Sequence, residues 1–336
     1  MIEHIVKKID EYNPPIDVTR ILSENIARTE YGDIPLSAVS SAKVFLLNAI
    51  GQMAAGATAR SSRIVMNYIR AIGGRPEATC IHYGHRTNIY NAALANGSFS
   101  FGNELPDPSG PLSLVSPVAP AALAICEREL ANGHELITAI ALGIEVTLRL
   151  ASAAPEIPVK RPLNPTSTFG PFGAAVAAGK ILRMGSEAIE NVLTCCPAQA
   201  AGTMQGFITK AESSKLVPGF AASYGLRAAT MASRGISGAR QMLEGKAGFY
   251  MCIAGLDAEG APRFYLDRVV ERFGQRWLIA ETAPNGLEEA RRTCGMLLAQ
   301  AGYSVEQGSA VSDIVSNIED EDDVTRLLSN LLIGGG

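Results

Sequence analysis

The sequence predicts an all-α, mainly helical protein, and three observations carry that prediction. Apolar residues recur three or four positions apart over long stretches, as in Leu36–Ala55, where Val44, Leu47 and Ile50 share one face. Strand-like patterns are scarce, and the best of them is the short segment Ala78–Tyr83. Of the 336 residues 47% are hydrophobic and only 18% are charged, so several helices should lie wholly inside the protein.

The expected helices follow one another with Gly, Pro, Asn or Ser between them. After Leu36–Ala55 they are Leu112–Ala131, Glu135–Ala153, Phe172–Leu182, Glu187–Ala201, Phe220–Ser233, Leu287–Ala301, Val311–Ile318 and Val324–Leu332. Prolines and glycines predict loops over Asn103–Pro120, Pro155–Pro171 and Ala254–Pro262. The acidic run Glu319–Asp323 is expected in the first turn of a helix, where carboxylates suit the helix dipole.

One helical domain is expected over residues 1–332, with 1–279 and 286–332 both contributing to it and a disordered tail over 333–336. Helices rich in Ala, Gly and Ser should pack closely, because small side chains let two backbones approach. The segment Met1–Asp10 carries charges throughout, so we do not expect a signal peptide. The expectation is a cytoplasmic protein whose six cysteines are reduced and mostly buried.

Composition and motifs exclude several classes of protein. A net charge of −4 argues against an electrostatic nucleic-acid surface, and no apolar run is long enough for a membrane span. Neither a phosphate-binding glycine motif nor a GxSxG elbow occurs. His82 and His85 lack a third ligand nearby and are expected in a turn beside a strand, while Cys195 and Cys196 are expected as buried thiols. No metal and no cofactor are expected.

Three segments punctuated by Gly and Pro lead into loops or helices: Asn91–Phe101, Leu163–Gly173 and Thr209–Ala222. Loops that precede helices point backbone N–H groups into a shared space, which would form a pocket between helices. Ordinary helix punctuation is an equally good interpretation of the same pattern.

Several segments, in order, resemble the MmgE/PrpD family, which includes 2-methylcitrate dehydratase and cis-aconitate decarboxylase. The similar segments are Ile34–Gly56, Ala92–Gly97 (AALANG), Ser116–Glu127 (SPVAPAALAICE), Phe169–Leu182 (FGPFGAAVAAGKIL), Gly219–Gly235, Leu243–Phe249 (LEGKAGF) and Asp320–Leu332 (DEDDVTRLLSNLL). The resemblance implies the family's helical domain and a homodimer built from it. The chain runs from Gly274–Ile279 almost directly into its C-terminal helices, so the family's α/β lid domain is expected to be missing or reduced to Ala280–Asn285.

This sequence differs from the family pattern at several positions where the resemblance implies acid–base residues. Histidine positions align with Phe101 and Asn164, and a third aligns with Ser113 or, after a loop insertion, with Asp107. The first acidic residue of the family pattern aligns with Glu104. Its lysine falls on Ser214, beside Lys215, and Val217 takes the place of the motif's His.

These replacements would leave an open, more apolar pocket, which suits a bulky hydrophobic secondary metabolite. The first hypothesis is therefore a cyclase or isomerase that holds one substrate conformer, with an intramolecular [4+2] Diels–Alder-type cyclisation as its sharpest form. The candidate catalytic residues are Glu104, Asn164, Ser214 and Lys215. The candidate substrate-binding residues are Phe101, Asn103, Asp107, Ser113, Thr166, Ser167, Phe169 and Val217.

Two alternatives stay open. The chain could be a family-like lyase on a carboxylic acid, with catalytic groups relocated to Glu104, Asp107, His85, Lys210 or Lys215. It could instead be a non-catalytic partner protein or a carrier of hydrophobic molecules, because a degenerate site is also what loss of activity leaves behind.

Overall fold

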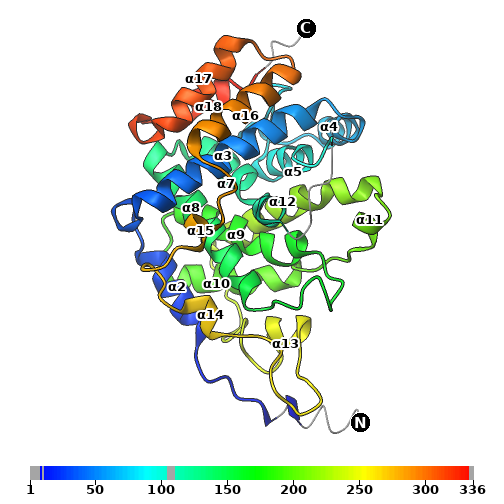
Figure 1. Ribbon diagram of the computed structural model, residues 1–336, viewed down its shortest axis with the longest axis vertical. Coiled ribbons are helices and arrows are strands. Elements are labelled where there is room, and N and C mark those ends of the chain that lie inside the picture. Colours follow the sequence, from blue (N-terminus) through cyan, green and yellow to red (C-terminus); the bar gives the residue numbers. More distant parts are fainter. Residues whose placement is uncertain (1–7, 10, 104–109, 333–336) are drawn as a thin grey trace.

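The computed structural model describes residues 8–9, 11–103 and 110–332 and is mainly helical, as the sequence predicts (Figure 1). The longer helices are α2 (Val18–Arg28), α3 (Leu36–Ala57), α4 (Arg60–Ile72), α5 (Ile89–Phe99), α7 (Val118–Glu129), α8 (Gly133–Ser152), α9 (Pro165–Ile181), α10 (Ser186–Cys195), α12 (Val217–Ala232), α16 (Leu287–Gln300) and α17 (Val305–Ser316).

Shorter elements connect the long helices. The short α-helices are α6 (Pro111–Val115), α11 (Gln205–Ile208), α13 (Phe249–Ile253), α14 (Asp267–Val270), α15 (Leu278–Thr282) and α18 (Thr325–Ser329). The 3-10 helices are η1 (Tyr31–Asp33), η2 (Cys196–Ala198), η3 (Glu212–Leu216) and η4 (Ile318–Asp320). Strands β1 (Ala78–Cys80) and β2 (His85–Thr87) pair antiparallel, which confirms the expected strand over its first part. Among the described residues, none of the helices combines the length and apolar character needed to span a bilayer.

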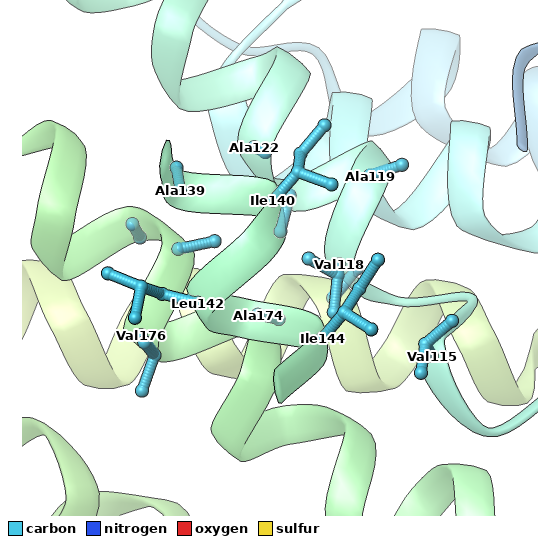
Figure 2. Close-up of a cluster of buried hydrophobic side chains, with 14 of the residues drawn as sticks. Val115, Val118, Ala119, Ala122, Ala139, Ile140, Leu142, Ile144, Ala174 and Val176 are labelled. Carbon is cyan, nitrogen blue, oxygen red and sulfur yellow. The ribbon is translucent and has the colours of Figure 1, made fainter. Parts of the chain in front are cut away.

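Helix α9 lies in the middle of the bundle and packs against α7, α8 and α12. Figure 2 shows part of the resulting core, with buried side chains from three helices: Val118 and Ala119 of α7, Ile140 and Ile144 of α8, and Ala174 and Val176 of α9. The α8 and α9 backbones touch, because a Cβ atom added to Gly173 would lie 2.5 Å from the carbonyl oxygen of Gly143. The expectation of wholly buried helices packed through small residues is confirmed.

The C-terminal helices pack on α3, beside which α16 runs in Figure 1. The ammonium of Lys43 fixes them, because its Nζ donates to the Ser316 carbonyl oxygen at 2.6 Å and to Glu319 Oε2 at 2.7 Å. Helix α15 is followed almost at once by α16. No lid domain is evident within the described ranges, which confirms the expectation of a missing or reduced lid.

Some predicted boundaries were wrong. The expected loop Asn103–Pro120 contains α6 and the start of α7, and the expected loop Pro155–Pro171 ends at Pro165, where α9 begins. Proline is tolerated at the first helical position, since its missing N–H is one that a helix start leaves unpaired in any case. Pro171 lies inside α9, whose buried contacts with three helices outweigh the lost hydrogen bond. The acidic run 319–323 is found in a first helical turn only in part: Glu319 and Asp320 lie in the first turn of the 3-10 helix η4, and 321–323 lie on the approach to α18.

Candidate functional site

Five of the candidate residues lie where the end of α5 meets η3 and the start of α12. We call Phe101, Asn103, Ser214, Lys215 and Val217 the Lys215 group. The Lys215 ammonium donates to the carbonyl oxygen of Gly102 at 2.7 Å, and the Asn103 amide nitrogen donates to the Ala55 carbonyl oxygen at 3.0 Å. The first bond joins residues 113 positions apart in the sequence, and the second joins residues 48 positions apart. Both bonds involve the turn 101–103 that follows α5.

Two close contacts of Gly102 fix the position of the chain at the end of α5. A Cβ atom on Gly102 would lie 2.3 Å from the Gly56 carbonyl oxygen and 2.8 Å from Ser62 Oγ, so only glycine fits there. Ser62 Oγ in turn donates to the Gly56 carbonyl oxygen at 2.6 Å. The turn that carries Phe101 and Asn103 is therefore held tightly against α3 and α4.

Ser214 is buried, and its hydroxyl has no hydrogen-bond partner among the described residues. The side chain faces Gly206 of α11, because a Cβ atom on that glycine would lie 2.5 Å from Ser214 Oγ. A buried hydroxyl without a partner is uncommon in folded proteins and leaves one donor and acceptor unused. Ser214, a candidate catalytic residue, thus carries an unsatisfied polar group among the described residues.

The remaining polar candidates gather at the start of α9. We call Ser113, Asn164, Thr166 and Ser167 the Asn164 group. Asn164 Oδ1 accepts the backbone N–H of Ser167 at 3.0 Å and so caps α9. Thr166 Oγ1 donates to the Ser113 carbonyl oxygen at 3.0 Å, and the two hydroxyls lie 3.2 Å apart. Ser113 and Thr166 are fully buried, and with the Thr166 proton on the Ser113 carbonyl, the Ser113 hydroxyl donates to Thr166 Oγ1.

The stretch 202–208 connects the two groups. The backbone N–H of Asn164 donates to the Gly202 carbonyl oxygen at 2.9 Å, and Asn164 Nδ2 lies 3.8 Å from the Met204 sulfur. At the other end of the stretch, Phe207 packs edge-to-face on Phe101 with ring centroids 6.1 Å apart. The two groups therefore border one continuous segment.

Three candidates lie elsewhere or outside the described residues. Phe169 is in an aromatic cluster with Phe249, at 6.0 Å between ring centroids. Glu104 and Asp107 lie outside the described residues. Of the alternative lyase residues, Lys210 is exposed in the turn before η3, and His85 opens β2.

Sequence reasoning missed Arg60 and Glu212, whose side chains form an exposed ion pair at 3.2 Å between α4 and η3. The pair lies beside the Lys215 group, because Arg60 precedes Ser62 and Glu212 precedes Ser214 in the chain. The two residues are 152 positions apart, and no local pattern in the sequence links them.

The sequence predicts a turn beside a strand for the histidines of residues 82–85 and burial for the adjacent cysteine pair. His82 lies in the turn after β1 as expected, and burial lowers the pKa of its imidazole. Cys196 is buried as expected, and burial raises the pKa of its thiol well above the usual value. Cys195 is only partly buried, and burial raises the pKa of its thiol as well. No trio of His, Cys, Asp or Glu among the described residues is arranged to hold a metal ion.

Replacing Asn164 with alanine should lower the free energy of unfolding by about 1 kcal/mol, because the first turn of α9 loses its cap. Asn164→Asp keeps the acceptor oxygen and should lose less. Urea unfolding measures both. Equal losses in the two variants would contradict the capping role of the side-chain oxygen.

Comparison with known proteins gives one family. The family model described as the MmgE/PrpD N-terminal domain matches residues 20–259. Human cis-aconitate decarboxylase is 27% identical over 241 residues, which cover 69% of this chain and 49% of the human protein. A cis-aconitate decarboxylase of Aspergillus terreus is 25% identical over 288 residues, covering 81% of this chain and 57% of the fungal protein. The chain thus spans about half the length of these curated relatives.

Proposed function

Because the chain belongs to the MmgE/PrpD family, we propose that it is a lyase-type enzyme that removes CO₂ or water from a carboxylic acid bound at the Lys215 group. The similarity to proteins named cis-aconitate decarboxylase supports this class of reaction. It is the alternative hypothesis from the sequence, and the position of Lys215 favours it over the cyclase.

The observation that carries the proposal is the placement of the Lys215 ammonium. One protein acceptor, the Gly102 carbonyl oxygen at 2.7 Å, holds Nζ at the end of α5. An ammonium has three donors, so further donors can serve a carboxylate there. The side chain is only part-buried, which leaves it within reach of a ligand.

A decarboxylation requires a bound carboxylate and a source of a proton. In a decarboxylation the bond between the departing carboxylate and its neighbouring carbon breaks, CO₂ leaves, and the electron pair stays on that carbon. A proton must then reach the carbon. Lys215 would stabilise the anion and deliver this proton, which solvent then replaces. The unsatisfied hydroxyl of Ser214, the preceding residue, would orient the acid.

The test is Lys215→Met, assayed with cis-aconitate and related di- and tricarboxylic acids for released CO₂ and for loss of water. We expect kcat/KM to fall about 100-fold, as for loss of one charged transition-state contact. Lys160→Met is the matched control, since Lys160 is exposed and pairs with Glu156 four residues away. Turnover by Lys215→Met equal to that of the control would reject the proposal.

A second candidate function is the cyclase or isomerase acting on a bulky hydrophobic metabolite. It is favoured by the neutral side chains that occupy the aligned positions: Phe101, Ser113, Asn164 and Val217. The buried hydroxyls of the Asn164 group would contribute at most a few hydrogen bonds, so catalysis would rest on shape. Incubation with linear polyene or diene–dienophile precursors tests it, and a rate equal to the buffer control would reject it. Binding of such a molecule without turnover would favour the carrier hypothesis.

We further propose that the chain forms a homodimer. An apolar stripe on α4 supports this, because Ile64, Tyr68 and Ile72 recur every four residues and are 50–56% exposed. Light scattering after size-exclusion chromatography should give twice the chain mass, and a monomer would refute the dimer.

A further inference from the structure

A cavity of about 280 Å³ lies at the end of α8, a helix on which α14 and α15 both pack. Its lining is mainly charged and consists of Arg149, Ser152, Arg268, Glu271, Arg276 and Leu278. The volume is just below the ~300–1,000 Å³ of pockets for drug-sized ligands, so the cavity suits a small metabolite. Arg268, Glu271 and Arg276 are exposed, so a dissolved molecule can reach them. The lining shares no residue with the Lys215 group or the Asn164 group.

Two of the three guanidiniums at the cavity are already neutralised by glutamates. Arg149 Nε donates to Glu145 Oε1 at 2.6 Å, and its two Nη atoms donate to backbone carbonyl oxygens. Arg276 pairs with Glu281 through two hydrogen bonds, from Nε at 2.8 Å and from Nη2 at 2.7 Å. Two-pronged pairs of this kind are the strong form of an arginine–carboxylate contact. These two arginines therefore form part of the cavity wall and carry their own counter-charges.

The third guanidinium and one carboxylate of the lining have no such counter-charge. Arg268 Nη1 donates to the Ser152 carbonyl oxygen at 3.0 Å, and its guanidinium carbon lies 4.1 Å from the centroid of the Tyr265 ring. Neither of these partners is an anion. Within the part of the chain that the structure describes, no ion pair joins Arg268 to a carboxylate, and none joins Glu271 to a cation. The cavity thus presents one positive and one negative charge that do not pair with each other.

Such an open pair of opposite charges is complementary to a zwitterion. The planar fork of an arginine matches a carboxylate, and an ammonium donates to carboxylate oxygens. Three arginines and three glutamates meet at this corner, so a ligand without net charge preserves its neutrality. A phosphate group, with its charge of about −1.5 to −2, would add an excess of negative charge beside Glu271.

We propose that this cavity binds a free α-amino acid, with its carboxylate on Arg268 and its ammonium on Glu271. Both charged groups of an α-amino acid are attached to one carbon. The ligand can therefore join two side chains that line one cavity without contacting each other. Leu278 is the apolar residue of the lining and offers a contact for an apolar ligand side chain.

Isothermal titration calorimetry of the full chain with L-leucine tests the site. Arg268→Met and Glu271→Gln should each weaken binding at least about tenfold, as for loss of one charge-assisted hydrogen bond. Arg292→Met is the matched control, since Arg292 is exposed on α16 and pairs at 3.7 Å with Glu289. This control should bind L-leucine as the wild type does.

Two analogues of leucine test the two charges on the wild-type protein, without any substitution. 4-Methylpentanoate lacks the ammonium and 3-methylbutylamine lacks the carboxylate, so each should bind about tenfold more weakly than L-leucine. 4-Methylpentanoate should bind Glu271→Gln at least as well as the wild type, because that variant no longer repels a lone carboxylate.

Four results would overturn the proposal. The first is a wild-type protein that binds neither L-leucine nor any other common amino acid. The second is an analogue that binds as tightly as L-leucine, and the third is inorganic phosphate that binds more tightly and depends on Arg268. The fourth is L-leucine binding that Lys215→Met removes and Arg268→Met leaves unchanged, since the amino acid would then occupy the Lys215 group.

Discussion

Replacing Arg149 with methionine should lower the free energy of unfolding by about 3–5 kcal/mol, because one partner of a buried ion pair is left behind. The pair joins Arg149 Nε to Glu145 Oε1 at 2.6 Å, and both side chains are almost completely buried, at 2% and 1% exposure. Glu145 would then be left buried without its cationic partner, while its other oxygen still accepts the backbone N–H of Ile279 at 3.0 Å.

The same guanidinium also fixes the chain that leads to the C-terminal helices. It donates to the carbonyl oxygens of Glu271 at 2.9 Å and Arg276 at 2.6 Å, and it lies 4.8 Å from the centroid of the Phe273 ring. Methionine fills much of the space but satisfies none of these acceptors. The loss should therefore include the segment 269–279 as well as the ion pair.

Chemical unfolding monitored by circular dichroism measures this effect. Arg268→Met is the matched control, because Arg268 is exposed and its Nη1 donates to the Ser152 carbonyl oxygen at 3.0 Å. It should change stability by less than about 1 kcal/mol. If Arg149→Met lost no more than the control, the buried pair would not be what anchors this segment.

The sequence was sufficient for some of the long helices, because their apolar periodicity is local. Leu36–Ala55 and Leu287–Ala301 were expected and are found with ends shifted by two residues or fewer. Helices α2 and α4 were not proposed, although both have a buried and an exposed face. The start of α9 was misjudged because five prolines in Pro155–Pro171 favour a loop, whereas burial against neighbouring helices decides the outcome.

The site was harder to predict because its contacts are non-local. Aligned positions gave the residues of the Lys215 group, but the bond from Lys215 to Gly102 spans 113 positions and could not be anticipated. The sequence makes Asn164 a candidate catalytic residue. In the structure the side-chain oxygen of Asn164 caps α9, and its amide nitrogen lies beside Met204. A capping residue can also line a pocket, so its site role stays a prediction.

Gly97→Ala should destabilise the protein by about 3 kcal/mol, at the upper end of the usual cost of overpacking. A Cβ atom there would lie 2.6 Å from the Gly219 Cα and 2.8 Å from its backbone nitrogen. Both atoms are backbone, so no side-chain rotation relieves the clash. The reverse contact is equally tight, because a Cβ atom on Gly219 would lie 2.3 Å from the Leu94 carbonyl oxygen. Helices α5 and α12 must therefore move apart.

That movement should also reach the Lys215 group, because Gly102 follows α5 and Lys215 lies in η3, which leads directly into α12. Gly295→Ala is the matched control: this glycine is also within a helix, α16, but a Cβ atom there meets nothing within 4 Å. It should stabilise the protein by about 0.5–1 kcal/mol through the better helix propensity of alanine. Urea unfolding of both variants separates the two effects. A Gly97→Ala protein as stable as the wild type would mean that the α5–α12 contact adjusts freely, and the position of Lys215 would then not depend on it.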